Sequence, residues 1–71
     1  MQRYANFGGE SSIYGYEIEP TRIRVMFSDD SVYSYSYASA GISNVERMKQ
    51  LAKSGYGLNS FIMRNVRNCS E

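Results

Sequence analysis

The sequence has no histidine and no tryptophan, and it has one cysteine and one proline among 71 residues. Without histidine it lacks the usual base at neutral pH and the commonest nitrogen ligand for metals. Cys69 has no partner for an internal disulfide and cannot build a zinc site alone, which fits a reducing compartment. We therefore expect a non-enzymatic protein with no catalytic residue, no metal and no cofactor.

Long apolar runs are also missing. No stretch approaches the roughly 18 residues of a membrane span, and the N-terminus lacks the apolar segment of a signal peptide. The net charge of +1 gives no long-range field, so an acidic partner would have to meet a local patch. A chain of 71 residues makes one domain whose core is only just sufficient. We expect a cytoplasmic protein with a flexible lead-in (1–12), one domain (13–67) and a frayed tail (68–71).

Alternating apolar and polar residues predict three strands. The first begins at Tyr14, carries Tyr14, Tyr16 and Ile18 on one face, and ends at a turn containing Pro20. The second covers residues 22–27, with its apolar side chains on one face and Arg22 and Arg24 on the other. The third carries three tyrosines at two-residue spacing: Tyr33, Tyr35 and Tyr37.

The length of the loop between the second and third strands decides which face the tyrosines share. A three-residue loop, 28–30, with Asp30 in the left-handed conformation places Tyr33 and Tyr35 opposite Val25 and Ile23, in the core. A two-residue loop, 29–30, instead places the tyrosines beside the arginines, as an aromatic and basic surface. The longer loop is favoured, because each tyrosine buries roughly 150–250 Å² and the shorter loop would bury serines instead.

Two helices are predicted after the strands. Ala38–Gly41 forms a connector of small residues, and Ser43 and Glu46 have the spacing of a capping box that opens a helix running to Ser54. Gly55 suits the end of that helix. A second helix is expected over about 59–68. The predicted fold class is therefore α+β, a three-stranded antiparallel sheet followed by two helices packed on one face.

The segment 27–35, Phe-Ser-Asp-Asp-Ser-Val-Tyr-Ser-Tyr, resembles the centre of the KTSC domain family. The resemblance extends from about Ser12 to Arg67, with Ala38–Gly41 standing where the family usually has a Val-Pro pair. It implies a small bacterial or phage-type domain, found alone or at the C-terminus of some lysyl-tRNA synthetases, for which RNA binding has been suggested. It brings no catalytic residues and carries over only Tyr33 and Tyr35 as motif residues.

Two kinds of partner remain open. Unpaired sheet edges and exposed rings, among them Phe7, Tyr37 and Tyr56, favour a protein partner or a homodimer. The alternative is weak binding of RNA or another single-stranded nucleic acid through the arginine-bearing sheet face. No small-molecule substrate is evident: Asp29 and Asp30 suit turn chemistry better than catalysis. The candidate contact residues are Arg22, Arg24, Tyr33, Tyr35, Tyr37, Lys53 and Arg64.

Overall fold

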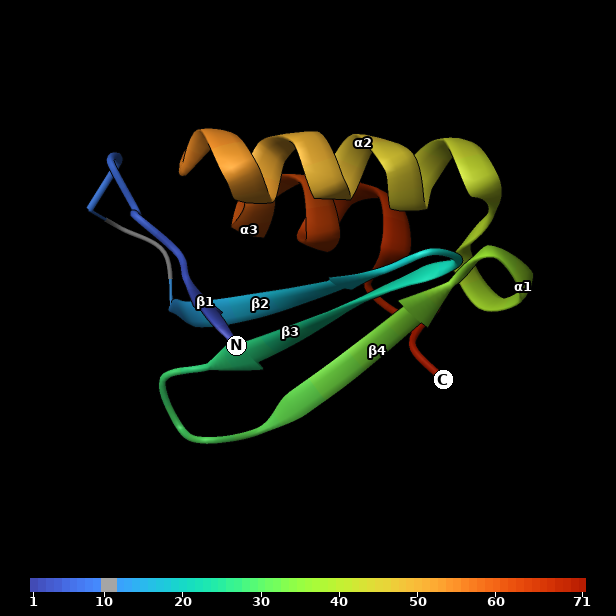
Figure 1. Ribbon diagram of the computed structural model, residues 1–71, viewed down its shortest axis with the longest axis horizontal. Coiled ribbons are helices and arrows are strands. Elements are labelled where there is room, and N and C mark those ends of the chain that lie inside the picture. Colours follow the sequence, from blue (N-terminus) through green and yellow to red (C-terminus); the bar gives the residue numbers. More distant parts are fainter. Residues whose placement is uncertain (10–11) are drawn as a thin grey trace.

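A computed structural model describes residues 1–9 and 12–71 of the chain. Four antiparallel strands lie in the order β1 (Gln2–Arg3), β2 (Ile13–Glu19), β3 (Arg22–Phe27) and β4 (Val32–Ser36). They are followed by α1 (Tyr37–Ala40), α2 (Ile42–Ser54), α3 (Leu58–Phe61) and a π-helix, η1 (Ile62–Val66). Helices α2 and α3 cover one face of the sheet and leave the other open (Figure 1).

The predicted α+β class, an antiparallel sheet followed by helices, is confirmed, but the number of strands was wrong. The additional strand, β1, lies in the expected lead-in and pairs with Gly15 and Tyr16 of β2. Just after β1, Tyr4 is buried, and its hydroxyl accepts a hydrogen bond from the Leu58 N–H at 3.2 Å. The part of the expected lead-in at residues 10 and 11 lies outside the described residues.

The three-residue loop between β3 and β4 is confirmed. Tyr35 pairs with Ile23 and Tyr33 with Val25, and Asp30 has a φ of 71°. Asp29 Oδ1 accepts hydrogen bonds from the Ser31 N–H at 3.0 Å and from Ser31 Oγ at 2.6 Å, and these bonds lower the pKa of its carboxyl. Asp29 therefore stabilises the turn, as the sequence predicted.

A β-bulge changes the pattern of β2. The pairing shifts between Ile13, which lies opposite Phe27, and Gly15, which lies opposite Met26. Because the bulge inserts one extra residue, Ile13 is buried and Tyr14 is 51% exposed. The expectation that Tyr14 shares a face with Tyr16 and Ile18 was therefore wrong at Tyr14.

The helix caps differ from the prediction. The capping box lies at α1, where Ser36 Oγ accepts from the Ser39 N–H at 3.0 Å and Ser39 Oγ accepts from the Ser36 N–H at 3.0 Å. The expected connector is thus mostly helical. Gly41, with a φ of 95°, separates α1 from α2, and α2 has no side-chain cap, so Ser43 does not cap it. The end of α2 at Gly55 is confirmed, with a φ of 77°.

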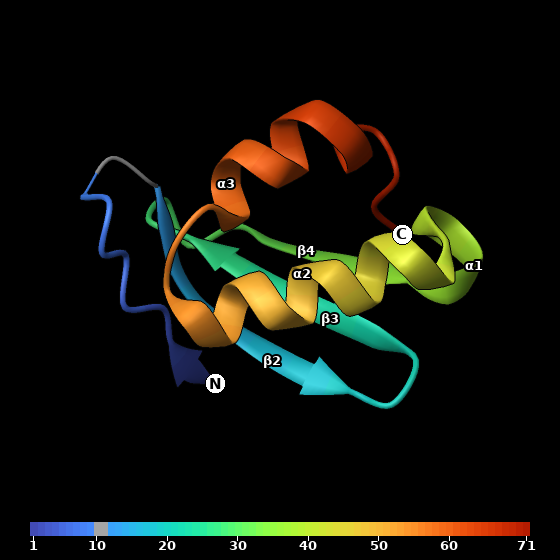
Figure 2. The same cartoon turned by 90° about the horizontal axis from the view of Figure 1, so that it is seen from above.

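The core lies between the sheet and the helices. Val45, Met48 and Ala52 of α2 are buried along one stripe, as predicted. The segment expected as a helix over 59–68 is instead α3 followed by η1, ending at Val66. Seen from above, α3 and the helical turns after it lie beside α2 (Figure 2). The core also takes side chains from every strand except β1, and its buried members are Tyr4, Ile13, Ile23, Val25, Tyr35, Ala40, Val45, Met48, Ala52, Leu58, Ile62 and Val66.

Candidate interaction surface

The sheet face that the helices leave open is called here the outer face. Alternate residues of each strand point to it, and the pairing aligns them in rows that cross the strands. One row joins Glu19, Arg22 and Ser36, the next joins Glu17, Arg24 and Ser34, and the third joins Gly15, Met26 and Val32. The outer face therefore has an acidic column on β2, a basic column on β3 and an apolar row at one end.

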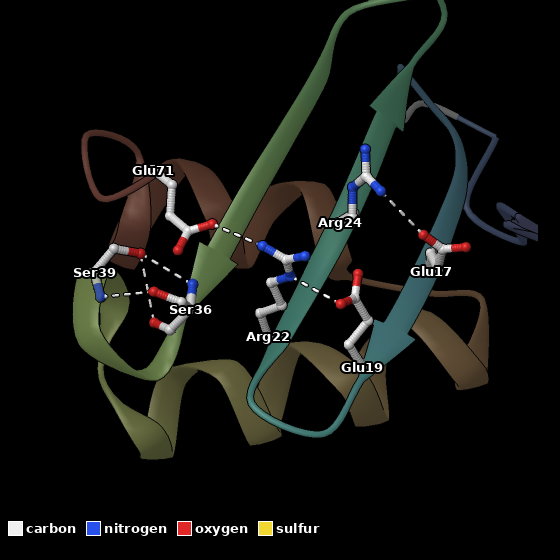
Figure 3. Close-up of polar contacts among 7 residues, drawn as sticks. All are labelled: Glu17, Glu19, Arg22, Arg24, Ser36, Ser39 and Glu71. Atoms are coloured by element: carbon white, nitrogen blue, oxygen red, sulfur yellow. Dashed lines mark hydrogen bonds and ion pairs between the residues drawn. The ribbon is translucent and has the colours of Figure 1, made fainter.

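Ion pairs connect these columns (Figure 3). Arg24 Nη1 lies 3.3 Å from Glu17 Oε1, and Arg22 Nε lies 2.9 Å from Glu19 Oε1. A third pair joins Arg22 Nη1 to Glu71 Oε1 at 3.5 Å. The hydrogen bond that Arg22 donates to Glu19, together with the negative charge of Glu19, raises the pKa of Arg22. Because each arginine already has a carboxylate partner, a phosphate group would have to compete with glutamates for both cations.

The apolar row adds exposed hydrophobic surface next to the ion pairs. Val32 is 41% exposed and lies opposite Met26. Gly15 has no side chain, and the position that a Cβ would occupy there is already filled: the Gln2 carbonyl oxygen lies 2.8 Å from it, and the Cγ and Sδ atoms of Met1 lie 3.4 Å from it. The row is therefore covered at Gly15 by Met1, whose own side chain is exposed.

The predicted tyrosines do not gather on the outer face. Tyr35 is 2% exposed, and burial raises the pKa of its hydroxyl. Tyr33 lies on the same side of the sheet as Tyr35 but is 45% exposed, so the expectation that it is part of the core was wrong. Its ring meets the Phe27 ring edge-on, with centroids 5.5 Å apart. Tyr33 and Tyr35 therefore do not form a stacking platform with Arg22 and Arg24.

Tyr37 lies beyond β4, in α1, and connects this helix to α2. Its hydroxyl donates to Glu46 Oε2 at 2.5 Å, and Lys49 Nζ lies 5.5 Å from the centre of its ring. Lys49 also pairs with Glu46 at 2.9 Å and donates to the Pro20 carbonyl at 3.0 Å. The hydrogen bond with Glu46 raises the pKa of Tyr37 and lowers that of Glu46. Tyr37 thus connects α1 to α2 and is not part of a contact surface on the sheet.

The remaining candidates lie elsewhere. Lys53 lines a hollow of about 680 Å³ at the edge of β2, and Arg64 lines another of about 480 Å³ beside Tyr56. The exposed rings of Phe7 and Tyr56 belong to segments joined by a hydrogen bond from the Phe7 N–H to the Gly55 carbonyl at 2.8 Å. The structure thus separates Lys53 and Arg64 from the arginines of the outer face.

Sequence reasoning missed the glutamates of the outer face. Glu17 and Glu19 could have been found, because a two-residue turn at Pro20–Thr21 places Glu19 opposite Arg22 and Glu17 opposite Arg24. No pattern in the sequence indicated that Glu71 lies at this face. It returns to the sheet from the far end of the chain, where its N–H donates to the Ser34 carbonyl at 2.7 Å.

Comparisons with known proteins assign neither a family nor a function to the chain. No family model, curated protein or solved structure matches the chain. Within residues 1–9 and 12–71, no group of three or more cysteine, aspartate or glutamate side chains could hold a metal ion. None of the helices in this part of the chain is long and apolar enough to cross a membrane.

Proposed function

We propose that the chain is a non-enzymatic interaction domain that self-associates through the outer face of its sheet. The observation that carries this proposal is the pairing of an acidic column on β2 with a basic column on β3 next to an exposed apolar row. Open faces of antiparallel sheets are commonly polar and solvated. Here the charges are ordered so that the face is complementary to a copy of itself.

Two-fold symmetry explains this complementarity. An axis parallel to the strands and between β2 and β3 places β2 of each copy over β3 of the other, and it keeps each row over the same row. Glu17 then faces Arg24 of the second copy, and Glu19 faces Arg22. In the apolar row, Met26 of one copy lies over Gly15 of the other and over the Met1 side chain that covers it.

The expected dimer is weak. The charged side chains involved are between 31% and 44% exposed, and an exposed ion pair contributes about 0–1 kcal/mol. Interfaces of this kind belong with small, transient contacts rather than with obligate dimers. Self-association should therefore be measured at protein concentrations up to about 1 mM.

Complementary charge reversals test the proposal. Arg24→Glu alone and Glu17→Arg alone each place like charges at the contact between copies, so each variant should be monomeric in sedimentation equilibrium. An equimolar mixture should associate again, because opposite charges then meet at both contacts. Arg47→Glu, an exposed reversal on α2, is the control and should leave association unchanged. A monomeric natural protein, or a mixture that stays monomeric, contradicts the proposal.

Binding of RNA or single-stranded DNA through the same face is the second candidate, because Arg22 and Arg24 lie in adjacent rows and remain partly exposed. A phosphate would have to displace Glu17 or Glu19 from these arginines. Glu17→Gln combined with Glu19→Gln should then increase binding in a fluorescence-anisotropy titration at low salt, and added salt should weaken it. Unchanged binding in this variant would exclude the face as a nucleic-acid site. We also propose that the chain is a KTSC-type domain, on the resemblance of residues 27–35, and that it is located in the cytoplasm.

A further inference from the structure

A hollow of about 480 Å³ lies between the segment that follows β1 and the start of α3. Both lie toward the end of the molecule opposite α1 (Figure 2). A hydrogen bond from the Phe7 N–H to the Gly55 carbonyl, at 2.8 Å, joins this segment to the loop that precedes α3. Pockets that bind small molecules have volumes of roughly 300–1,000 Å³. The hollow therefore has the size of a small-molecule site, and the main chain holds its two walls together.

The polar side chains that α3 and η1 contribute to the hollow are donors without acceptors. Arg64 of η1 forms no hydrogen bond or ion pair among the described residues, and Ser60 lies four positions before it. The side chains of Asn59 and Ser60 likewise have no partner in this part of the chain. None of the described residues that line the hollow is acidic, so no carboxylate there competes for Arg64. The π-helical geometry of η1 is rare and is frequent at functional sites.

Tyr4 adds a buried donor to the opposite wall. It is 4% exposed, and its hydroxyl oxygen accepts a hydrogen bond from the Leu58 N–H at 3.2 Å. This bond places the hydroxyl beside Gly57, which also lines the hollow. The hydroxyl carries a proton as well, and no described residue supplies an acceptor for it. Because buried polar groups are normally hydrogen-bonded, the free proton favours an acceptor atom inside the hollow.

An aromatic ring forms part of the same wall. Tyr56 is 64% exposed, and its Cε1 atom lies 3.2 Å from the position that a Cβ would occupy at Gly8. The ring therefore lies against the main chain at Gly8, which holds it beside the hollow and leaves most of it accessible. An accessible ring in a fixed position can pack on a planar ring of a ligand.

We propose that this hollow binds a small phosphate monoester that carries a planar ring. Arg64 pairs with the charge of the phosphate, and Ser60 and Tyr4 donate to its oxygens. A phosphate fits these separate donors because it offers three strong acceptor oxygens, where a carboxylate offers two. The planar ring of the ligand packs on Tyr56. The site shares no residue with the outer face, so it does not depend on self-association.

The probes are phenyl phosphate, adenosine monophosphate and inorganic phosphate, each titrated into the ¹⁵N-labelled protein at constant ionic strength. The amide resonances of Asn59, Ser60 and Arg64 should shift with a Kd of about 1 mM. At least one of the two ring-bearing probes should bind about fivefold more tightly than inorganic phosphate, because ring packing adds to the phosphate contacts. In phenyl phosphate the ring is attached directly to the phosphate, whereas in adenosine monophosphate a ribose separates them. The tighter of the two probes therefore identifies the spacing that the site accepts.

Single substitutions assign the contacts. Arg64→Gln should weaken all three probes by about tenfold, since it removes the charged donor. Tyr56→Ala should weaken the tighter ring-bearing probe by about fivefold and leave inorganic phosphate within about twofold. Tyr4→Phe, which keeps the buried ring, should weaken all three probes by about threefold. Arg67→Gln, at an exposed arginine that does not line the hollow, is the control and should change no affinity by more than about twofold.

Several results would overturn the proposal. They are the absence of shifts at about 10 mM phenyl phosphate and adenosine monophosphate, an inorganic phosphate that binds as tightly as both of them, an unchanged affinity in Tyr56→Ala, or equal losses in Arg64→Gln and Arg67→Gln. The titration is repeated on Arg24→Glu, in which the outer face is altered. Retained binding there separates the hollow from self-association, and loss of binding there contradicts the separation argued above.

Discussion

Replacing Tyr35 with alanine tests how the sheet meets the helices. Tyr35 is 2% exposed and lies opposite Ile23, which is fully buried. Truncating a buried aromatic ring to alanine costs about 3–5 kcal/mol, because the apolar surface is lost and a cavity remains. At about 0.05–0.15 kcal/mol per residue, a chain of 71 residues has roughly 4–11 kcal/mol of stability in total. Tyr35→Ala should therefore remove a large part of it.

Tyr33→Ala is the matched control, since Tyr33 lies on the same strand and the same side of the sheet but is 45% exposed. Its truncation should cost about half as much, because about half of the ring area is already in water. Tyr35→Phe should cost less than about 1 kcal/mol, since it keeps the buried ring.

Urea unfolding followed by circular dichroism at 25 °C measures all three variants. A constant slope against urea concentration shows that each change acts on stability and not on the unfolded chain. We expect the midpoint to fall furthest for Tyr35→Ala, then for Tyr33→Ala, and least for Tyr35→Phe. Equal midpoints for the two alanine variants would contradict the position of Tyr35, but not of Tyr33, in the closed part of the core.

Three further outcomes follow from the contacts and pKa shifts. Gly55→Ala should destabilise by about 1–3 kcal/mol more than Gly57→Ala in urea unfolding, because both have positive φ but only at Gly55 would a Cβ lie 2.6 Å from Ala5 Cβ; equal losses would contradict the close approach. The pKa of Glu46 is lowered, first of all by the hydrogen bond from Tyr37, so Glu46 contributes stability above pH about 4.5 that is lost as the pH falls. Glu46→Gln should therefore flatten the acid dependence of the melting temperature. An unchanged acid dependence in this variant would show that Glu46 does not contribute to it. The raised pKa of buried Tyr35 contributes stability below pH about 10 that is lost as pH rises through the folded value; Tyr35→Phe should reduce this alkaline loss, and an equally steep loss would assign it to other groups.

The sheet register could be predicted because local chemistry determines it. Asp29 and Asp30 are residues that support tight turns, and Asp30 tolerates a positive φ. Burying tyrosines rather than serines then selects the three-residue loop, which the pairing of Tyr35 with Ile23 confirms. The apolar stripe of α2 and its end at Gly55 were likewise visible, since both depend on residues close together in the chain.

The features that sequence reasoning missed depend on distant contacts. Strand β1 has only two residues, and it forms where the segment before Tyr4 pairs with β2. The bulge at Tyr14 is a property of the pairing of β2 with β3, and its one local signal is Gly15, an isolated glycine inside the strand pattern. Ser36 and Ser43 can each form a capping box with the residue three positions later. Ser36 forms it because the short α1 begins directly after β4 and turns the chain out of the sheet.

The outer face follows from the same register as the core. Turn length fixes which residues lie opposite each other, and alternation sends their neighbours to the other side of the sheet. Once Tyr35 lies opposite Ile23 in the core, Arg24 must lie opposite Ser34 on the outer face. The Pro20–Thr21 turn then brings Glu17 opposite Arg24. The acidic and basic columns are therefore set by two turns that also bury the core, so the charge pattern on which self-association is proposed cannot shift without unfolding the sheet.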